Sequence, residues 1–142
     1  MASDMVVFGD KELLTKLARL GKAGDKIARD SSRSVAKDLQ AIVKAEAPVK
    51  TGRLRKGIKV RGAKRSRQYV GSIVRLGTRK EMGIPADAKH YYPAAVMYGQ
   101  EARGIPGRNF LLIATERFRA RGIAKFRSLL ARGIASAARA GR

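Results

Sequence analysis

The chain has 142 residues, with 32 Lys and Arg against 11 Asp and Glu, so its formal net charge is +21. Its length and its 44% hydrophobic content are typical of one compact domain, expected to span residues 1–142, and differ from those of intrinsically disordered chains. The absence of cysteine excludes disulfides and thiolate metal sites, and no apolar run is long enough to cross a membrane.

The positive charge is concentrated in the later part of the chain. Residues 1–46 contain nine basic and seven acidic residues, whereas residues 47–142 contain 23 basic and four acidic residues. Twelve basic residues lie within residues 50–80 and eight within residues 117–142, and neither segment contains an acid. Such segments attract polyanions or acidic protein surfaces, although a solvated basic face is the simpler alternative.

A short strand at residues 5–8 and a long helical region at residues 11–46 are predicted for the first part of the chain. Apolar residues recur there at helical spacing, interrupted by two glycines, which predicts one long helix or two nearly collinear helices. Asp10 is a suitable N-cap residue. Pro48 ends the helical region, because the residue before a proline disfavours the helical conformation.

Three strands and a final helix are predicted for the remainder. The strands are expected at residues 58–61, 69–76 and 91–98, with Pro93 placing the third at a sheet edge or bulge. A helix is expected from Phe110 to the end, capped by Asn109, in which residues 131–142 form either its last turns or a tail that orders on docking. The order β-α-β-β-β-α predicts an α+β domain: a small antiparallel sheet with a long N-terminal and a long C-terminal helix packed on it.

No pattern in the sequence is typical of an active site. His90 is the only histidine, which excludes a metal site with two imidazoles, and the acids after residue 46 lack the paired spacing of acid–base catalysis. The segment 52–59 lacks the Gly-Lys-Ser/Thr ending of a phosphate-binding loop. We therefore predict that the protein is not an enzyme and binds no metal and no other cofactor.

Clustered basic side chains bind nucleic acid through its phosphates without reading its sequence. No helix-turn-helix, zinc-finger or RNA-recognition signature is present, so any such contact is expected to be independent of sequence. The residues expected to contact nucleic acid or an acidic partner are Arg53, Arg55, Lys56, Lys59, Arg61, Lys64, Arg65 and Arg67.

Four segments occur in an order that carries a family resemblance. They are G-D-K-E-L-L-T-K-L at residues 9–17, A-P-V-K-T-G-R-L-R-K-G-I at 47–58, Y-P-A-A-V-M-Y-G at 92–99 and P-G-R-N-F-L at 106–111. Together they resemble the tail-completion (minor tail or neck) proteins of long-tailed bacteriophages. The motif residues are Pro48, Thr51, Gly52, Leu54, Tyr98, Gly99 and Phe110. For the element at residues 48–52, local structure is a sufficient explanation, because proline ends a helix and Thr-Gly turns the chain into a strand.

The resemblance implies a structural virion protein at the phage head–tail junction. Its subunits are expected to form a homo-oligomeric ring, commonly of six, which completes the tail and docks it to the connector around the DNA channel. The implied partners are neighbouring connector or stopper proteins and tail-tube or terminator proteins, with non-specific contact to genomic DNA and none to membranes. Synthesis is expected in the host cytoplasm. A free-standing, sequence-independent nucleic-acid-binding protein is the alternative, and a tail terminator is a lesser one.

Overall fold

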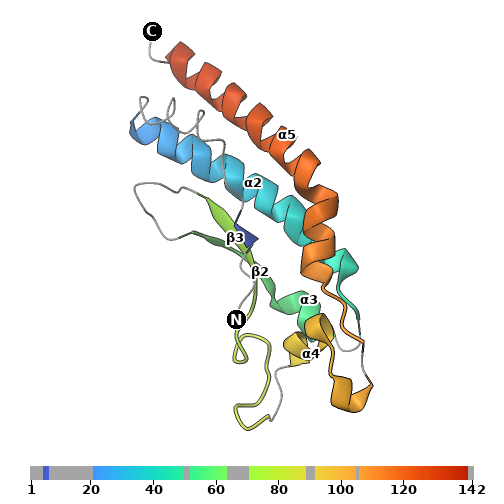
Figure 1. Ribbon diagram of the computed structural model, residues 1–142. Helices are drawn as coiled ribbons and strands as arrows, with labels where there is room; N and C mark the ends of the chain where they lie inside the picture. Colours follow the sequence, from blue (N-terminus) through green and yellow to red (C-terminus); the bar gives the residue numbers. More distant parts are fainter. Residues whose placement is uncertain are drawn as a thin grey trace.

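The computed structural model describes residues 5–6, 21–49, 52–63, 71–88, 92–104 and 106–140. Two long helices lie side by side, and a small sheet packs against one of them (Figure 1). This arrangement confirms the predicted α+β class. The elements in chain order are β1 (Met5–Val6), α2 (Lys22–Glu46), α3 (Arg53–Gly57), β2 (Ile58–Gly62), β3 (Ser72–Leu76), α4 (Tyr92–Tyr98), the 3-10 helix η1 (Glu101–Arg103) and α5 (Phe110–Ala140).

The sheet is antiparallel, with β3 between β1 and β2. Helix α2 packs against both β2 and β3 on one side and against α5 on another, so it lies between the sheet and α5. Two polar contacts fix α2 on the sheet. Gln40 Nε2 donates a hydrogen bond to the Ile58 carbonyl at 2.7 Å, and the buried hydroxyls of Ser32 and Ser72 lie 3.2 Å apart.

Helix α2 begins after Gly21, whose φ of 63° is outside the helical region. A single uninterrupted helix through this position is therefore excluded, and the predicted helical segment at 11–20 and the Asp10 cap lie outside the described residues. The predicted end is confirmed: Glu46 is the last helical residue, and Ala47, which precedes Pro48, is extended with φ −68° and ψ 129°.

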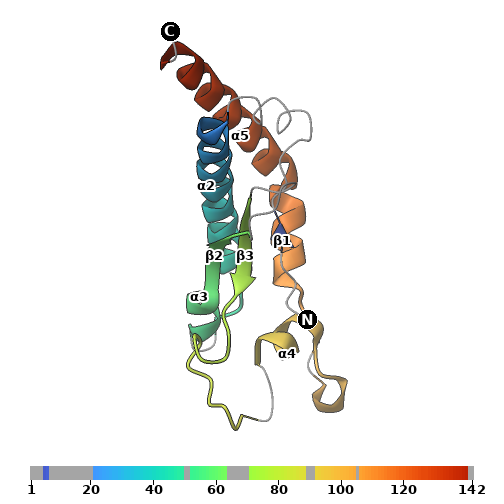
Figure 2. The same cartoon turned by 90° about the vertical axis from the view of Figure 1, so that its left-hand side faces the viewer.

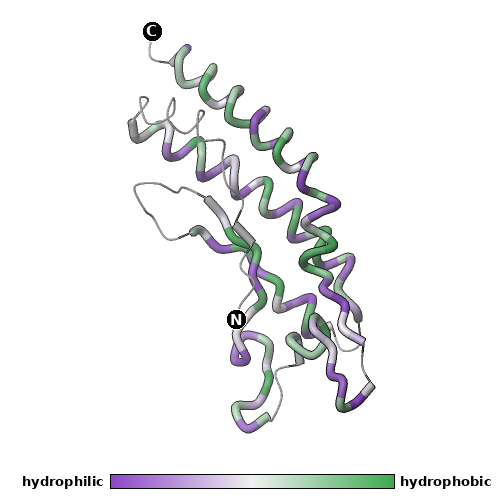
Figure 3. The backbone as a smooth tube through the Cα atoms, in the orientation of Figure 1, coloured by the Kyte–Doolittle hydropathy of each residue, from purple (hydrophilic) through white to green (hydrophobic). Residues whose placement is uncertain are grey.

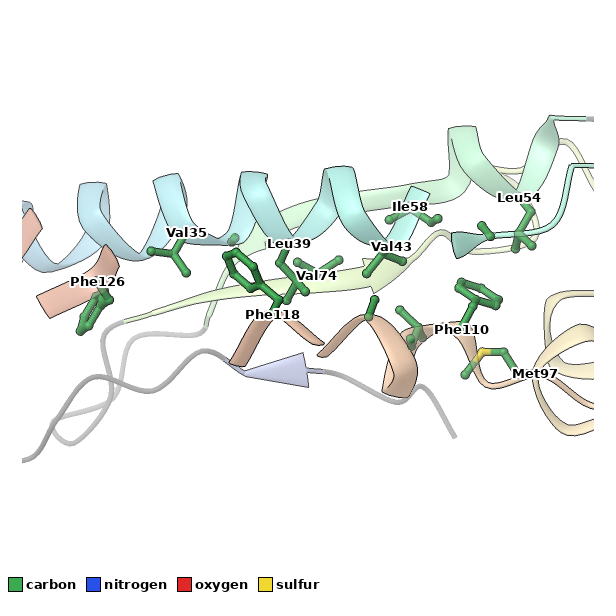
Figure 4. Close-up of a cluster of buried hydrophobic side chains, with 14 of the residues drawn as sticks. Val35, Leu39, Val43, Leu54, Ile58, Val74, Met97, Phe110, Phe118 and Phe126 are labelled. Carbon is green, nitrogen blue, oxygen red and sulfur yellow. The ribbon is translucent and has the colours of Figure 1, made fainter. Parts of the chain in front are cut away.

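The core follows the line along which α2 meets its neighbours. Hydrophobic and hydrophilic residues alternate along both long helices (Figure 3), as expected for helices that each bury one face. Figure 4 shows side chains from α2, the sheet and α5 in one cluster. Its buried members include Val35, Leu39, Val43, Val74, Phe118 and Phe126. A Cβ added at Gly133 of α5 would lie 2.4 Å from Cγ2 of Ile27, so the absence of a side chain there permits close helix packing.

The third predicted strand is wrong: residues 92–98 form helix α4. Pro93 is the second residue of this helix, where its missing N–H is not needed for an intrahelical hydrogen bond. Pro93 and Met97 are both buried. The helix ends at Tyr98, and the next residue, Gly99, has a φ of 78° that favours glycine. Two other short elements, α3 and η1, were not predicted from the sequence.

Helix α5 begins as expected from the sequence. The Leu112 N–H donates a hydrogen bond to Asn109 Oδ1 at 3.1 Å, which confirms Asn109 as the N-cap. The helix continues through Ala140, so residues 131–140 are helical. Among the described residues, no helix is both long and apolar enough to cross a membrane.

Candidate interaction surfaces

Helix α3 presents two of the predicted contact residues to solvent. Gly52, with a φ of 73°, turns the chain into this helix. Leu54 is 1% exposed and anchors α3 in the core, which leaves Arg53 and Lys56 exposed. Arg55 is half-buried, and its Nε donates a hydrogen bond to the Ala47 carbonyl at 3.4 Å. Arg55 therefore connects α3 to the end of α2, whereas its two basic neighbours are accessible to a partner.

Strand β2 carries the next two predicted contact residues on the face of the sheet opposite to Ile58, which is buried against α2. Lys59 lies directly opposite Arg75 of β3 in the antiparallel register. Two like charges in this position destabilise a sheet unless an anion lies between them. Arg61, two residues further along, is exposed.

Glu81 supplies that anion. Its two carboxylate oxygens accept hydrogen bonds from Nη1 and Nη2 of Arg75, each at 2.9 Å, and Lys59 Nζ lies 3.4 Å away. The Thr78 N–H also donates to this carboxylate, at 2.7 Å. The hydrogen bonds from Arg75, followed by the one from Thr78, hold the pKa of Glu81 well below its ordinary value. Lys59 and Arg75 are thus engaged within the protein.

The predicted contact residues do not form one patch among the described residues. Arg53 and Lys56 lie on α3, whereas Arg61 lies near the end of β2 that is farther from α3 (Figure 2). None of these three forms an ion pair with a described carboxylate. Lys64, Arg65 and Arg67 lie outside the described residues. The role of the whole set in binding nucleic acid or an acidic partner stays a prediction.

The family-motif residues gather where α2 ends and α5 begins. Leu54 and Phe110 are buried together with Met97 (Figure 4). In contrast, Tyr98 is 60% exposed. Pro48 is also exposed, Gly52 and Gly99 have positive φ, and Thr51 lies outside the described residues. Leu54 and Phe110 therefore build the core at this end, and Tyr98 faces outward.

Glu46, the last residue of α2, holds this end together. Its carboxylate accepts a hydrogen bond from Arg108 Nη2 at 2.8 Å and a second from Arg117 of α5. The Arg108 N–H donates in turn to the Val96 carbonyl of α4 at 2.9 Å. Sequence reasoning did not identify Glu46, because its partners lie 62 and 71 positions away along the chain.

The described residues contain no group of three or more His, Cys, Asp or Glu side chains placed to hold a metal ion. His90 lies outside them. The described surface carries dispersed basic side chains, together with exposed apolar residues near the Glu46 ion pairs. This combination of apolar and charged groups is suited to binding another macromolecule.

Comparison with known proteins identifies a family. The family model described as "Bacteriophage HK97-gp10, putative tail-component" matches residues 11–97, which is more than half of the chain. The matched range includes α2, α3, β2, β3 and most of α4, and it stops before α5. No curated protein and no solved structure matches the chain.

Proposed function

The chain belongs to the HK97-gp10-like family of bacteriophage tail components, and we propose that it is a structural protein of the head–tail junction. In this role, identical subunits form a ring, which we propose is hexameric. The ring completes the tail and docks it to the connector around the DNA channel. The family match is the observation that carries this proposal. A structural subunit of this kind catalyses no reaction.

The distribution of charge supports a ring. A closed ring joins its subunits head to tail, so each subunit needs two different and complementary surfaces. Helix α2 is of mixed charge, because its exposed Asp25 and Asp30 are interleaved with the exposed cations Lys26, Arg29, Arg33 and Lys37. Helix α5 exposes several arginines and carries a single acid, Glu116. One subunit therefore offers a mixed-charge helix and a strongly basic helix, and two unlike surfaces are what a heterologous contact requires.

Deletion of the coding sequence from its phage tests the proposal. We expect DNA-filled heads and separate tails to accumulate, because the two assemblies lack the subunit that joins them. The full-length chain supplied from a plasmid should restore joined particles. Normal infectious particles after the deletion would contradict the proposal. Tails of uncontrolled length would instead favour a tail terminator.

Sequence-independent binding of nucleic acid is a second candidate, favoured by the exposed arginines of α5. Four of them form no ion pair with a described carboxylate, although Arg121 lies over the Phe118 ring at 5.3 Å. These four are Arg119, Arg121, Arg132 and Arg139. The test is the salt dependence of binding to duplex DNA. Each phosphate-contacting arginine that is replaced by alanine should lower the log–log slope by about one unit. An unchanged slope would exclude these arginines from DNA contact.

A further inference from the structure

Among the residues that the structure describes, most of the large apolar side chains that remain exposed lie at one end of the molecule. Val49 is 58% exposed and follows the end of α2, Tyr98 is 60% exposed and ends α4, and Leu112 is 53% exposed in the first turn of α5. Figures 1 and 2 both place these three element ends at the same end of the molecule. Ile123, which is 43% exposed, lies further along α5. We call Val49, Tyr98 and Leu112 the end surface.

One carboxylate connects the three segments that carry the end surface. Glu46 is three residues before Val49, and it accepts hydrogen bonds from Arg108 and from Arg117 of α5. The side chain of Glu46 is only 16% exposed, so this contact is partly shielded from water. Because the Arg108 N–H also bonds to Val96, α4 is tied to the same point.

A close backbone approach adds to this rigidity. A Cβ added at Gly107 would lie 2.4 Å from the carbonyl carbon of Tyr98 and 2.5 Å from the Gly99 nitrogen. Glycine is thus the residue that allows the chain before α5 to pass directly beside the end of α4. The exposed Tyr98 is therefore carried on backbone held from two sides, as suits a preorganised binding residue.

The charge around the end surface is predominantly positive. Arg53 and Lys56 of α3 and Arg103 of η1 are exposed and form no ion pair with a described carboxylate, whereas the exposed Arg108 is paired with Glu46. The exposed acids of η1 and of the first two turns of α5 are Glu101 and Glu116. Protein interfaces combine an apolar centre with a polar edge, and tyrosine and arginine are enriched among the residues that dominate binding energy.

We propose that the end surface docks an acidic protein of the virion that is different from this chain. This inference rests on the proposed function, because it assigns the contact with a neighbouring protein to a particular surface. Two copies joined through the same surface would bring their basic edges together, which is unfavourable. A partner with apolar residues surrounded by Asp and Glu would match both the centre and the edge.

Complementation of the deletion phage tests the surface. The triple variant Val49→Ser, Tyr98→Ser and Leu112→Ser is compared with Ile123→Ser, which removes an exposed apolar side chain outside the end surface. Loss of a dominant interface residue weakens binding roughly 30-fold. We therefore expect the triple variant to lower the infectious titre at least roughly 30-fold, and Ile123→Ser to leave it unchanged. Equal titres for the two variants would overturn the proposal. Equal melting temperatures of the purified variants verify that both fold.

Photocrosslinking identifies the partner while the rest of the end surface stays unchanged. The full chain, carrying benzoylphenylalanine in place of Tyr98, is assembled into particles and irradiated. We expect a covalent adduct with another virion protein, at a segment rich in Asp and Glu. An adduct between two copies of this chain, an adduct with DNA or no adduct would each overturn the proposal.

The two proposals fail in different ways. If deletion of the chain leaves normal particles, the proposed function is wrong. If deletion blocks joining but the triple variant restores it fully, only the assignment of the end surface is wrong.

Discussion

The pair of long helices and the end surface of this protein are held in place by different sets of contacts. Helices α2 and α5 are positioned by buried apolar side chains and by the close approach at Gly133. The end surface also rests on buried apolar side chains, Leu54, Met97 and Phe110, but it is held in addition by the Glu46 carboxylate and by backbone contact at Gly107. Most of the buried apolar residues that the structure describes lie on α2 and α5, so the helix pair contributes more of the core than the end surface does. Substitutions in the helix pair should therefore mainly lower stability, whereas substitutions of exposed residues of the end surface should mainly impair particle assembly.

The largest effect is expected from Leu39→Ala in the helix pair. Leu39 is 1% exposed and lies in the cluster shared by α2, the sheet and α5. Its truncation leaves a cavity and should lower the free energy of unfolding by about 2–5 kcal/mol. Urea denaturation measures this change. Lys37→Ala, an exposed change on the same helix, serves as the control and should stay within about 0.5 kcal/mol of wild type. Equal losses for the two would contradict the assignment of the core.

A smaller loss is expected from Gly107→Ala at the end of the molecule. The added Cβ meets Tyr98 backbone atoms, which cannot rotate away as a flexible side chain can. We expect a loss of about 1–3 kcal/mol from overpacking. Gly62→Ala is the matched control, because its added Cβ meets nothing within 4 Å. If both variants melt at the same temperature, the close approach at Gly107 is not a real constraint.

Glu46→Gln should cost less still. Its partners Arg108 and Arg117 are 59% and 65% exposed, so solvent screens the ion pairs and the expected loss is at most about 1 kcal/mol. The loss should shrink in 1 M salt, where screening is strong. Denaturation at low and high salt measures it, with Glu116→Gln as the control because Glu116 forms no ion pair with a described residue. A loss that is independent of salt would contradict an ionic role for Glu46.

The smallest effect is expected from Glu81→Gln, and it should depend on pH. Because the pKa of Glu81 is lowered in the folded protein, its charge stabilises the fold above the ordinary carboxyl pKa of about 4.3 and this contribution is lost as the pH falls below that value. Melting temperatures from neutral to acidic pH should fall more steeply for wild type than for Glu81→Gln. The control Asp87→Asn should follow wild type. Parallel curves for wild type and Glu81→Gln would refute the role of this carboxylate.

Local patterns in the sequence predicted the features that local physics determines. The apolar periodicity of α2 and α5, the stop before Pro48 and the Asn109 cap each depend on neighbouring residues, and the structure confirms them. The segment at residues 92–98 was wrongly predicted as a strand, because a short apolar and aromatic run is compatible with either a strand or a buried helix. Its position beside residues 107 and 108 is set by a close backbone approach and a backbone hydrogen bond, which the pattern of the segment itself does not show.

The candidate surfaces were harder to predict for the same reason. The sequence showed that basic residues are clustered, but it did not show that Glu81 engages Lys59 and Arg75 across two strands. Nor did it show that Glu46 joins α2 to Arg108 and Arg117. In a chain with only 11 acids, the position of each carboxylate decides which cations stay available to a partner.

The most direct test of the central claim is a density map of the head–tail junction in intact particles. We expect this chain to appear there as a closed ring around the DNA channel, with the end surface against a different protein. A junction map fully explained by other proteins, or this chain located elsewhere in the particle, would contradict the account.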